Sequence, residues 1–274
     1  MADQRVLITG SAGIVGTLMR PRLRRDGRVL RLLDLAPQAA AEPGEAVELR
    51  TGSVTDAEAM AAACEGVDAV IHLGGHSREN SWEATLEVNI NGTHTVLEAA
   101  RAAGVSRVIL ASSNHAAGFR RNDEAGEAGL PADSSPRPDT YYGVSKAAIE
   151  ALGSLYHSRF GMDVIVVRIG SCFETPLPLG PRGLTTWLSP DDGARLFEAC
   201  LGAPSPGYRL VWGVSDNTRR IYSLAEAEAL GYKSLDDAEV YAAQLADRPL
   251  PTGIAAEYVG GPFCTAPLGE FNPL

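Results

Sequence analysis

The sequence predicts an α/β fold built on a doubly wound parallel sheet, and three observations support it. Short apolar segments alternate with segments of helical periodicity along most of the chain, which is typical of a parallel sheet covered on both faces. A glycine-rich turn follows the first apolar segment, and polar or glycine residues follow several others. With 274 residues, 45% of them hydrophobic, the chain can also bury the core that such a fold requires.

The first two elements are expected to be a short buried strand at residues 5–9 and an amphipathic helix from residue 14 to about residue 26. Gly10, Gly13 and Gly16 have the spacing Gly-x-x-Gly-x-x-Gly, which differs from the commonest dinucleotide fingerprint, Gly-x-Gly-x-x-Gly. Glycine lets the backbone approach a pyrophosphate, and a helix N-terminus offers unpaired N–H groups. Strand, turn and helix together predict the phosphate-binding unit of a Rossmann-type sheet.

The second strand, expected at residues 29–33, ends at Asp34. A carboxylate at this point can accept hydrogen bonds from both ribose hydroxyls of adenosine, and it repels a 2′-phosphate. Asp34 therefore predicts NAD rather than NADP as the cofactor.

The remaining elements continue the alternation of strands and helices. Residues 122–138 are dense in Gly, Pro, Asp and Ser and predict a loop. We expect further strands at residues 46–50, 68–73, 108–111 and 164–168, and helices at residues 56–64, 83–103 and 140–160.

Ligands of such folds bind where the strands end, so the residues after the fourth and fifth strands are informative. Gly74 and Gly75 follow the fourth strand and permit the close approach of a cofactor. Ser113, Asn114 and His115 follow the fifth strand. The serine can hydrogen-bond a substrate hydroxyl, and the other two side chains offer contacts to a polyhydroxylated ligand.

Tyr142 and Lys146 lie four residues apart on an expected helix, so their side chains project from the same face. A free tyrosine ionises near pH 10, so a tyrosine base at neutral pH needs its pKa lowered by roughly three units, or about 4 kcal/mol. We expect the Lys146 ammonium to supply much of this shift and an oxidised nicotinamide to supply more. Together with Ser113 at the same sheet edge, the pair predicts one shared site.

Composition and charge disfavour several other classes of function. The net charge of −10 disfavours a nucleic-acid partner. No apolar run reaches membrane-spanning length and the N-terminus lacks a signal-peptide pattern, so we expect a cytoplasmic protein without a membrane partner. Cys64, Cys172, Cys200 and Cys264 show no metal-ligand spacing, and no second histidine or carboxylate stands at ligand spacing from His115. We therefore expect no metal.

One pattern joins residues that are far apart in the chain: Gly10, Gly13, Gly16, Asp34, Asn89, Ser113, Tyr142 and Lys146. In this pattern the chain resembles the extended branch of the short-chain dehydrogenase/reductase superfamily. Further segments extend over most of the sequence: residues 112–115, 142–146, 168–172, 186–189 with Asp191 and Asp192, and 211–213. In these the chain resembles the bacterial uronate dehydrogenases. The last three segments are not general superfamily motifs, so they make this narrower resemblance specific.

The resemblance implies NAD-dependent oxidation of a hexuronic acid, galacturonate or glucuronate, at its anomeric carbon, with an aldarolactone and NADH as products. It implies that Tyr142 removes the C1 hydroxyl proton as hydride leaves for C4 of the nicotinamide. In the same reaction Lys146 binds the nicotinamide ribose and Ser113 orients the reacting oxygen. A homo-oligomer is also implied, because long helices such as residues 83–103 and 140–160 often pair between subunits in this superfamily.

The resemblance implies that Arg182 binds the C6 carboxylate of the substrate. Uronate dehydrogenases carry an arginine just before the Thr-Trp motif, and Arg182 fits that position. Its planar fork can hold a carboxylate bidentately. Ser77, Asn114, His115 and Ser171 are expected to bind sugar hydroxyls or the carboxylate.

The residues expected at the cofactor come from the ends of successive strands. Ser53 stands where many relatives place an aspartate for the adenine amino group, and its hydroxyl can still accept that hydrogen bond. The full expected set is Gly10, Gly13, Ile14, Val15, Gly16, Asp34, Ser53, Val54, Leu73, Gly74, Gly75, Asn89, Tyr142, Lys146 and Ile169.

We expect residues 1–170 to form the NAD-binding core that carries the catalytic serine, tyrosine and lysine. Residues 171–274 are expected to form a small substrate-binding and C-terminal region packed on this core as one compact unit. Two other classes of function stay open. A sugar-nucleotide epimerase or dehydratase of the same branch would use the Tyr/Lys pair and return the hydride within one cycle. A non-catalytic dinucleotide sensor would keep the glycine turn and lose the catalytic residues.

Overall fold

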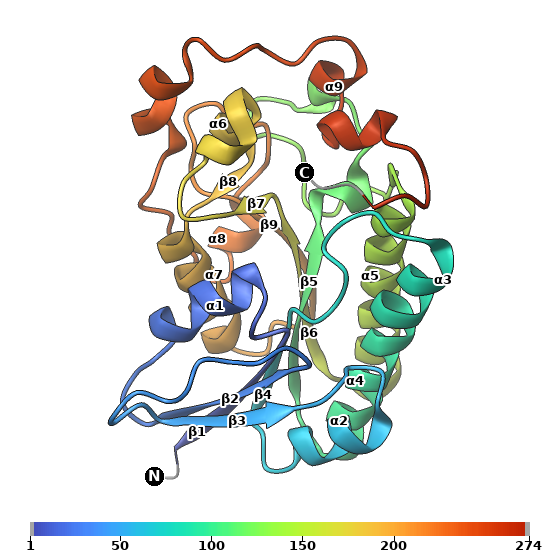
Figure 1. Ribbon diagram of the computed structural model, residues 1–274, viewed down its shortest axis with the longest axis vertical. Coiled ribbons are helices and arrows are strands. Elements are labelled where there is room, and N and C mark those ends of the chain that lie inside the picture. Colours follow the sequence, from blue (N-terminus) through green and yellow to red (C-terminus); the bar gives the residue numbers. More distant parts are fainter. Residues whose placement is uncertain (1–2, 272–274) are drawn as a thin grey trace.

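The computed structural model describes residues 3–271 and is built around a seven-stranded parallel sheet (Figure 1). The strand order is β3-β2-β1-β4-β5-β6-β9, and all neighbouring pairs run parallel. This arrangement confirms the predicted fold class. The strands of this sheet are β1 Gln4–Thr9, β2 Arg28–Asp34, β3 Val47–Thr51, β4 Ala69–His72, β5 Arg107–Ser113, β6 Asp163–Ile169 and β9 Tyr208–Gly213.

Helices cover both faces of the sheet and enclose two apolar cores (Figure 1). Successive residues of a strand point to opposite faces, so Val6 and Ile8 of β1 pack in one core and Leu7 packs in the other. One face carries α1 Ile14–Arg22, α7 Pro190–Gly202 and α8 Ala225–Glu228, and the other carries α2 Ala57–Cys64, α4 Gly92–Ala102 and α5 Tyr141–Phe160.

The predicted elements differ from the structure at several places. Helix α1 ends at Arg22 rather than near residue 26, with Pro21 in its last turn and a capping hydrogen bond from the Leu23 N–H to the Met19 carbonyl. The elements after β6, including α7 and β9, have no counterpart among the predicted strands and helices. The helix predicted over residues 83–103 is divided into α3 (Trp82–Thr85), a π-helical segment η1 (Leu86–Asn91) and α4.

Segments that follow β6 build a cap over the carboxyl edge of the sheet, in the upper part of Figure 1. Helix α7 and strand β9 also follow β6 in the chain, and they pack in the core. The residues after 170 therefore contribute to the cap and to the core. Within residues 3–271, no helix is long and apolar enough to cross a membrane. The short elements are β7 Ser171–Cys172, β8 Trp187–Leu188, η4 Leu177–Arg182, α6 Gly183–Thr186, η5 Ala238–Leu245, α9 Ile254–Glu257 and η6 Gly261–Thr265, with η2 Asn114–Ala117 and η3 Asn122–Glu124 after β5.

Candidate active site

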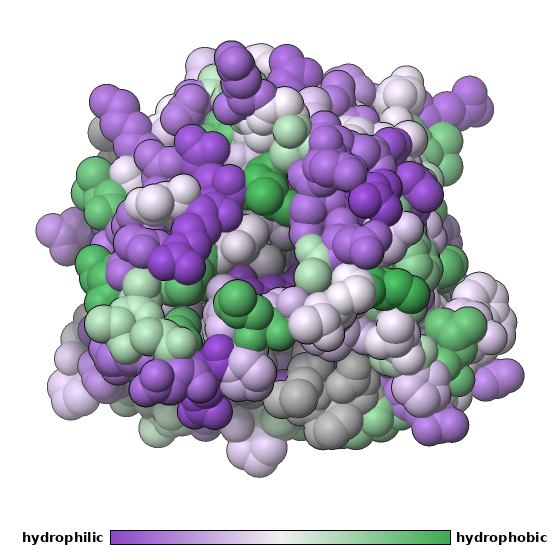
Figure 2. Space-filling view, turned by 90° about the horizontal axis from the view of Figure 1, so that it is seen from above, coloured by the Kyte–Doolittle hydropathy of each residue, from purple (hydrophilic) through white to green (hydrophobic). Residues whose placement is uncertain are grey.

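A cavity of about 580 Å³ lies at the carboxyl edge of the sheet, where β1, β2, β4, β5 and β6 end. It spans the point between β1 and β4 where the strand order reverses, which is where open α/β sheets bind ligands. Seen from above, this face of the molecule is hollowed in the middle and rimmed largely by hydrophilic residues (Figure 2).

One end of the cavity is formed by the glycine turn between β1 and α1. Gly10 has φ +69°, and a Cβ at this position would lie 2.6 Å from the main-chain nitrogen of Gly74. Only glycine therefore allows the turn to pack against the segment that follows β4. Gly13 is the N-cap of α1 and lines the cavity, so the open N-terminus of the helix faces the cavity and is suited to an anionic group.

Asp34 and Ser53 line the same end of the cavity. The Asp34 carboxylate accepts hydrogen bonds from the main-chain N–H groups of Ala12 and Ala36, both at 2.9 Å. Among residues 3–271 no arginine or lysine pairs with it, so its charge is directed at the cavity and suits a ribose diol. The Ser53 hydroxyl shares a hydrogen bond of 2.8 Å with the hydroxyl of Thr55.

Asn89 does not line the cavity, but its side chain is hydrogen-bonded to the loop after β4. Its amide Oδ1 accepts from the main-chain N–H of His76 at 2.7 Å, and its Nδ2 donates to Ser145 Oγ at 2.9 Å. A Cβ on Gly75 would lie 2.9 Å from Asn89 Oδ1. The π-helical segment thus inserts a buried amide between the loop after β4 and helix α5, and π-turns recur at functional sites.

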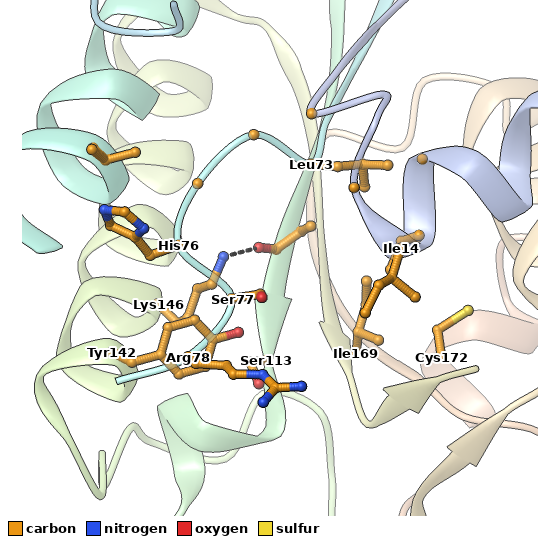
Figure 3. Close-up of a pocket in the computed structure, with 18 of the residues that line it drawn as sticks. Ile14, Leu73, His76, Ser77, Arg78, Ser113, Tyr142, Lys146, Ile169 and Cys172 are labelled. Carbon is orange, nitrogen blue, oxygen red and sulfur yellow. Dashed lines mark hydrogen bonds between the residues drawn. The ribbon is translucent and has the colours of Figure 1, made fainter. Parts of the chain in front are cut away.

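Ser113, Tyr142 and Lys146 meet in the middle of the cavity wall (Figure 3). Tyr142 and Lys146 project from the same face of α5, with the Lys146 Nζ 5.4 Å from the centre of the tyrosine ring. The ammonium donates to the Ala111 carbonyl at 2.7 Å, and this bond to β5 fixes the lysine. The geometry agrees with the spacing argument for a shared site.

The pKa of Tyr142 differs from the sequence-based expectation. Burial raises the pKa of the phenol to about 12, although the hydrogen bond with Ser113 lowers it; the charge of Asp139 raises it further. Burial also lowers the pKa of Lys146 to about 8. In the protein alone, burial therefore decides the direction of the shift. The expectation that Lys146 supplies much of a downward shift, and an oxidised nicotinamide more, stays a prediction for the protein with its cofactor.

Ser77, His115, Ser171 and Arg182 line the other end of the cavity. His115 Nδ1 lies 2.6 Å from the Asp139 carboxylate, so this nitrogen is the donor and Nε2 is free to face a ligand. The imidazole also stacks on Phe263, with ring centres 3.9 Å apart.

Arg182 and Asn114 are both tied to the C-terminal segment. Arg182 Nη2 donates to the Val259 carbonyl at 2.8 Å, and Asn114 Nδ2 donates to the same carbonyl at 3.2 Å. Arg182 has no carboxylate partner among residues 3–271 and lines the cavity. Asn114 is fully buried and does not line it, so its predicted contact to a sugar stays a prediction.

Besides Asp139, two further carboxylates beside the site are absent from the predicted set. Buried Glu79 accepts hydrogen bonds from the main-chain N–H groups of Tyr142, at 2.8 Å, and Gly269, at 2.9 Å. It thereby holds the N-terminus of α5 and ties it to the C-terminal segment. Glu150 forms a buried ion pair with Arg168 at 2.7 Å. Neither residue belongs to a motif, so only the folded chain reveals their partners.

The fold and this cavity define a class: a Rossmann-type protein that binds a dinucleotide beside a Ser/Tyr/Lys set. A sequence profile described as the NAD dependent epimerase/dehydratase family matches residues 6–174. The chain belongs to this family, and the resemblance inferred from its motifs is confirmed.

Several relatives are similar over nearly their whole length. A uronate dehydrogenase of Pseudomonas putida is 43% identical over 98% of this chain and 97% of its own. A solved variant of the uronate dehydrogenase of Agrobacterium tumefaciens, in complex with NAD, is 38% identical with a TM-score of 0.89, over 97% of this chain and 98% of that chain. A glucuronic acid dehydrogenase from Chromohalobacter salexigens is 35% identical with the same TM-score, over 96% and 97% of the two chains.

Proposed function

We propose that the protein oxidises a hexuronic acid, galacturonate or glucuronate, at C1 to the aldarolactone and transfers the hydride to NAD. One observation carries the proposal: a single cavity joins the glycine turn and Asp34 to Ser113, Tyr142, Lys146 and an arginine without a carboxylate partner among residues 3–271. Similarity along the whole chain to proteins described as uronate dehydrogenases supports the choice of substrate.

The cavity suits the cofactor along its whole length. When bound, NAD supplies the hydride acceptor and a positive charge at its nicotinamide ring. The backbone of the glycine turn would hold the pyrophosphate, Asp34 the adenosine ribose and Lys146 the nicotinamide ribose. The other expected cofactor residues that line the cavity are Ile14, Val15, Ser53, Val54, Leu73, Gly74, Gly75 and Ile169.

Tyr142 would act as the base that removes the C1 hydroxyl proton. The Ser113 hydroxyl contacts the phenol and would orient the sugar oxygen between them. Because the pKa of Lys146 is about 8, the amine is still mostly protonated at neutral pH. Its charge would favour the phenolate once the cofactor is present.

The far end of the cavity would select the acid group of the substrate. Arg182 offers its guanidinium to the C6 carboxylate, which an arginine fork can bind bidentately. Ser77, His115 and Ser171 would bind sugar hydroxyls, with His115 held in place by Asp139 and Phe263. In this proposal residues 171–274 supply Ser171 and Arg182, and the core supplies Ser77 and His115.

A panel of uronic acids and neutral aldoses, assayed with NAD and with NADP by the absorbance of reduced nicotinamide, tests the function. We expect stoichiometric NADH from galacturonate or glucuronate and little from neutral aldoses or with NADP. A preference for neutral aldoses would contradict the uronate proposal. Tight retention of NAD without net NADH would favour an epimerase or dehydratase.

The proposal includes a homo-oligomer that works in the cytoplasm. Two large apolar side chains of α5, Leu155 and Phe160, are exposed, as an interface between paired helices would require. All four cysteines are free, which is typical of a reducing compartment. Light scattering of the wild type and of Leu155→Glu tests the assembly; equal masses for the two proteins would remove α5 from it.

A further inference from the structure

The arginines of this chain fall into two groups. Most have a carboxylate within ion-pair distance, as Arg168 has in Glu150. Among residues 3–271, five lack one: Arg78, Arg159, Arg182, Arg209 and Arg248. Three of these are exposed at the surface, where water solvates the charge. Arg78 and Arg182 are half-buried, and both line the active-site cavity.

Arg78 is positioned by its neighbours in the loop after β4. Glu79, the next residue, is anchored in the interior by main-chain N–H groups of α5, and Ser77, the preceding residue, lines the cavity. Within the described part of the chain, the Arg78 guanidinium has no hydrogen-bond or ion-pair partner. Figure 3 shows its side chain reaching across Tyr142, with the guanidinium beside Ser113 in this view.

The two guanidinium groups reach the same cavity from different elements. Arg78 comes from the loop after β4, and Arg182 comes from η4 in the cap. A chain with a net charge of −10 thus presents, in one cavity, two guanidinium groups that have no carboxylate partner among residues 3–271. One guanidinium can neutralise a monocarboxylate, whereas a dianion such as a phosphate monoester has charge and oxygen atoms for two.

We propose that Arg78 and Arg182 together accept an aldohexose 6-phosphate, which the protein oxidises at C1 as a second activity. The inference rests on the proposed function, because the same hydride transfer is used. The C1–H bond breaks and its hydride reduces NAD to NADH. The C1 hydroxyl proton passes to Tyr142 and then to solvent. The product is the 6-phospho-lactone, and the phosphate monoester is unchanged.

The test compares three substrates in one assay: galacturonate, glucose 6-phosphate and unphosphorylated glucose, each with NAD. We expect kcat/KM for glucose 6-phosphate to exceed that for glucose by roughly tenfold or more, since even one of the two charge-assisted contacts would give about that gain. The kcat/KM values of galactose 6-phosphate and galactose are compared in the same way.

The variants are Arg78→Gln and, as a matched control, Arg159→Gln, which removes an exposed arginine of α5. Arg78→Gln is expected to lower kcat/KM for the 6-phosphate roughly tenfold to a hundredfold, because a charged hydrogen-bond partner of the phosphate is lost. The effect on galacturonate is expected to stay below about threefold, since Arg182 remains for its carboxylate. Arg159→Gln should change neither value.

Each other outcome has a separate meaning. Turnover of galacturonate without turnover of any hexose 6-phosphate overturns the inference and leaves the proposed function intact. An equal loss for all substrates in Arg78→Gln, with weaker NAD binding in a fluorescence titration, assigns Arg78 to the cofactor and also overturns it. Absence of turnover with every sugar overturns the proposed function and the inference together.

Discussion

The two ends of the cavity are built in different ways. The dinucleotide end is made largely of main chain from neighbouring segments: the turn after β1 is held by a hydrogen bond of 2.9 Å from Gly10 N–H to the Leu33 carbonyl at the end of β2. The substrate end is made of side chains from distant segments, such as Arg182 and His115, which are held by Val259 and Phe263 near the C-terminus.

This difference separates what is general from what is specific in the site. A phosphate is bound by N–H groups that any sequence with the right glycines can offer. A sugar acid is recognised by a few charged and polar side chains whose positions depend on long-range packing. The dinucleotide end should therefore tolerate changes in the cap, and the substrate end should tolerate changes in β2.

The largest expected effect comes from Tyr142→Phe, which removes the proton acceptor and keeps the ring. We expect kcat to fall by about a thousandfold, within the range for loss of a general base, while the Kd for NAD changes less than about twofold. Activity assays and fluorescence titration of NAD measure the two values. Tyr141→Phe is the matched control, and comparable losses in both variants would contradict the assignment.

Arg182→Ala tests whether Arg182 binds the substrate and not the cofactor. Loss of a charged hydrogen-bond partner should raise KM for galacturonate roughly tenfold to a hundredfold and leave the Kd for NAD nearly unchanged. Arg182→Lys keeps the positive charge but loses the planar guanidinium, so its KM for galacturonate should lie between those of the wild type and Arg182→Ala. Wild-type activity of Arg182→Ala would remove this residue from the substrate site.

Asp34→Asn tests the dinucleotide end in the same way. The amide keeps an oxygen acceptor for the main-chain N–H groups but loses the charge that repels a 2′-phosphate. We expect the preference for NAD over NADP to drop about tenfold, with the KM for galacturonate unchanged. Steady-state kinetics with both cofactors measure the ratio; an unchanged ratio would mean that Asp34 does not face the ribose.

The smallest effect is expected at His72, which lies between the two ends on β4. Burial lowers the pKa of its imidazole to about 3, and its nitrogens bond the hydroxyls of Thr9 and Thr93. The unfolded chain takes up a proton below about pH 6.5 and the folded chain does not, so acid destabilises the fold from about pH 6.5 down to about pH 3.

Urea unfolding at two pH values measures this effect. The free energy of unfolding should fall by about 1 kcal/mol between pH 6.5 and pH 5.5 on account of His72, and His72→Gln should lose that part of the dependence. An identical pH dependence in the two proteins would show that the imidazole already titrates normally in the folded state.

The sequence predicts that Gly10, Gly13 and Asp34 lie together because they belong to one continuous strand-turn-helix-strand unit with a fixed spacing, and the three residues line one cavity. Their contacts to the cofactor stay predictions. The pairing of Tyr142 with Lys146 can also be predicted from the sequence, since the two residues lie one helical turn apart. The contacts of several other site residues cannot be predicted from local sequence patterns. The partners of Glu79, Arg182 and His115 come from residues 139–269, and only tertiary packing brings them together.

The pKa of Tyr142 shows the same limit. Sequence spacing indicates that a lysine is near, but burial of the phenol depends on the whole cap and decides the direction of the shift. β9 is a further example, because its strand status depends on pairing with β6, in the register Val164 to Tyr208.

In the proposed reaction hydride passes from C1 of a uronic acid to NAD while Tyr142 takes the hydroxyl proton. The most direct measurement is mass spectrometry of the NADH formed from galacturonate that carries deuterium at C1. We expect the deuterium to appear in NADH with the wild type, and we expect Tyr142→Phe to form almost no labelled NADH. Unlabelled NADH from the labelled sugar, or rapid labelling by Tyr142→Phe, would contradict it.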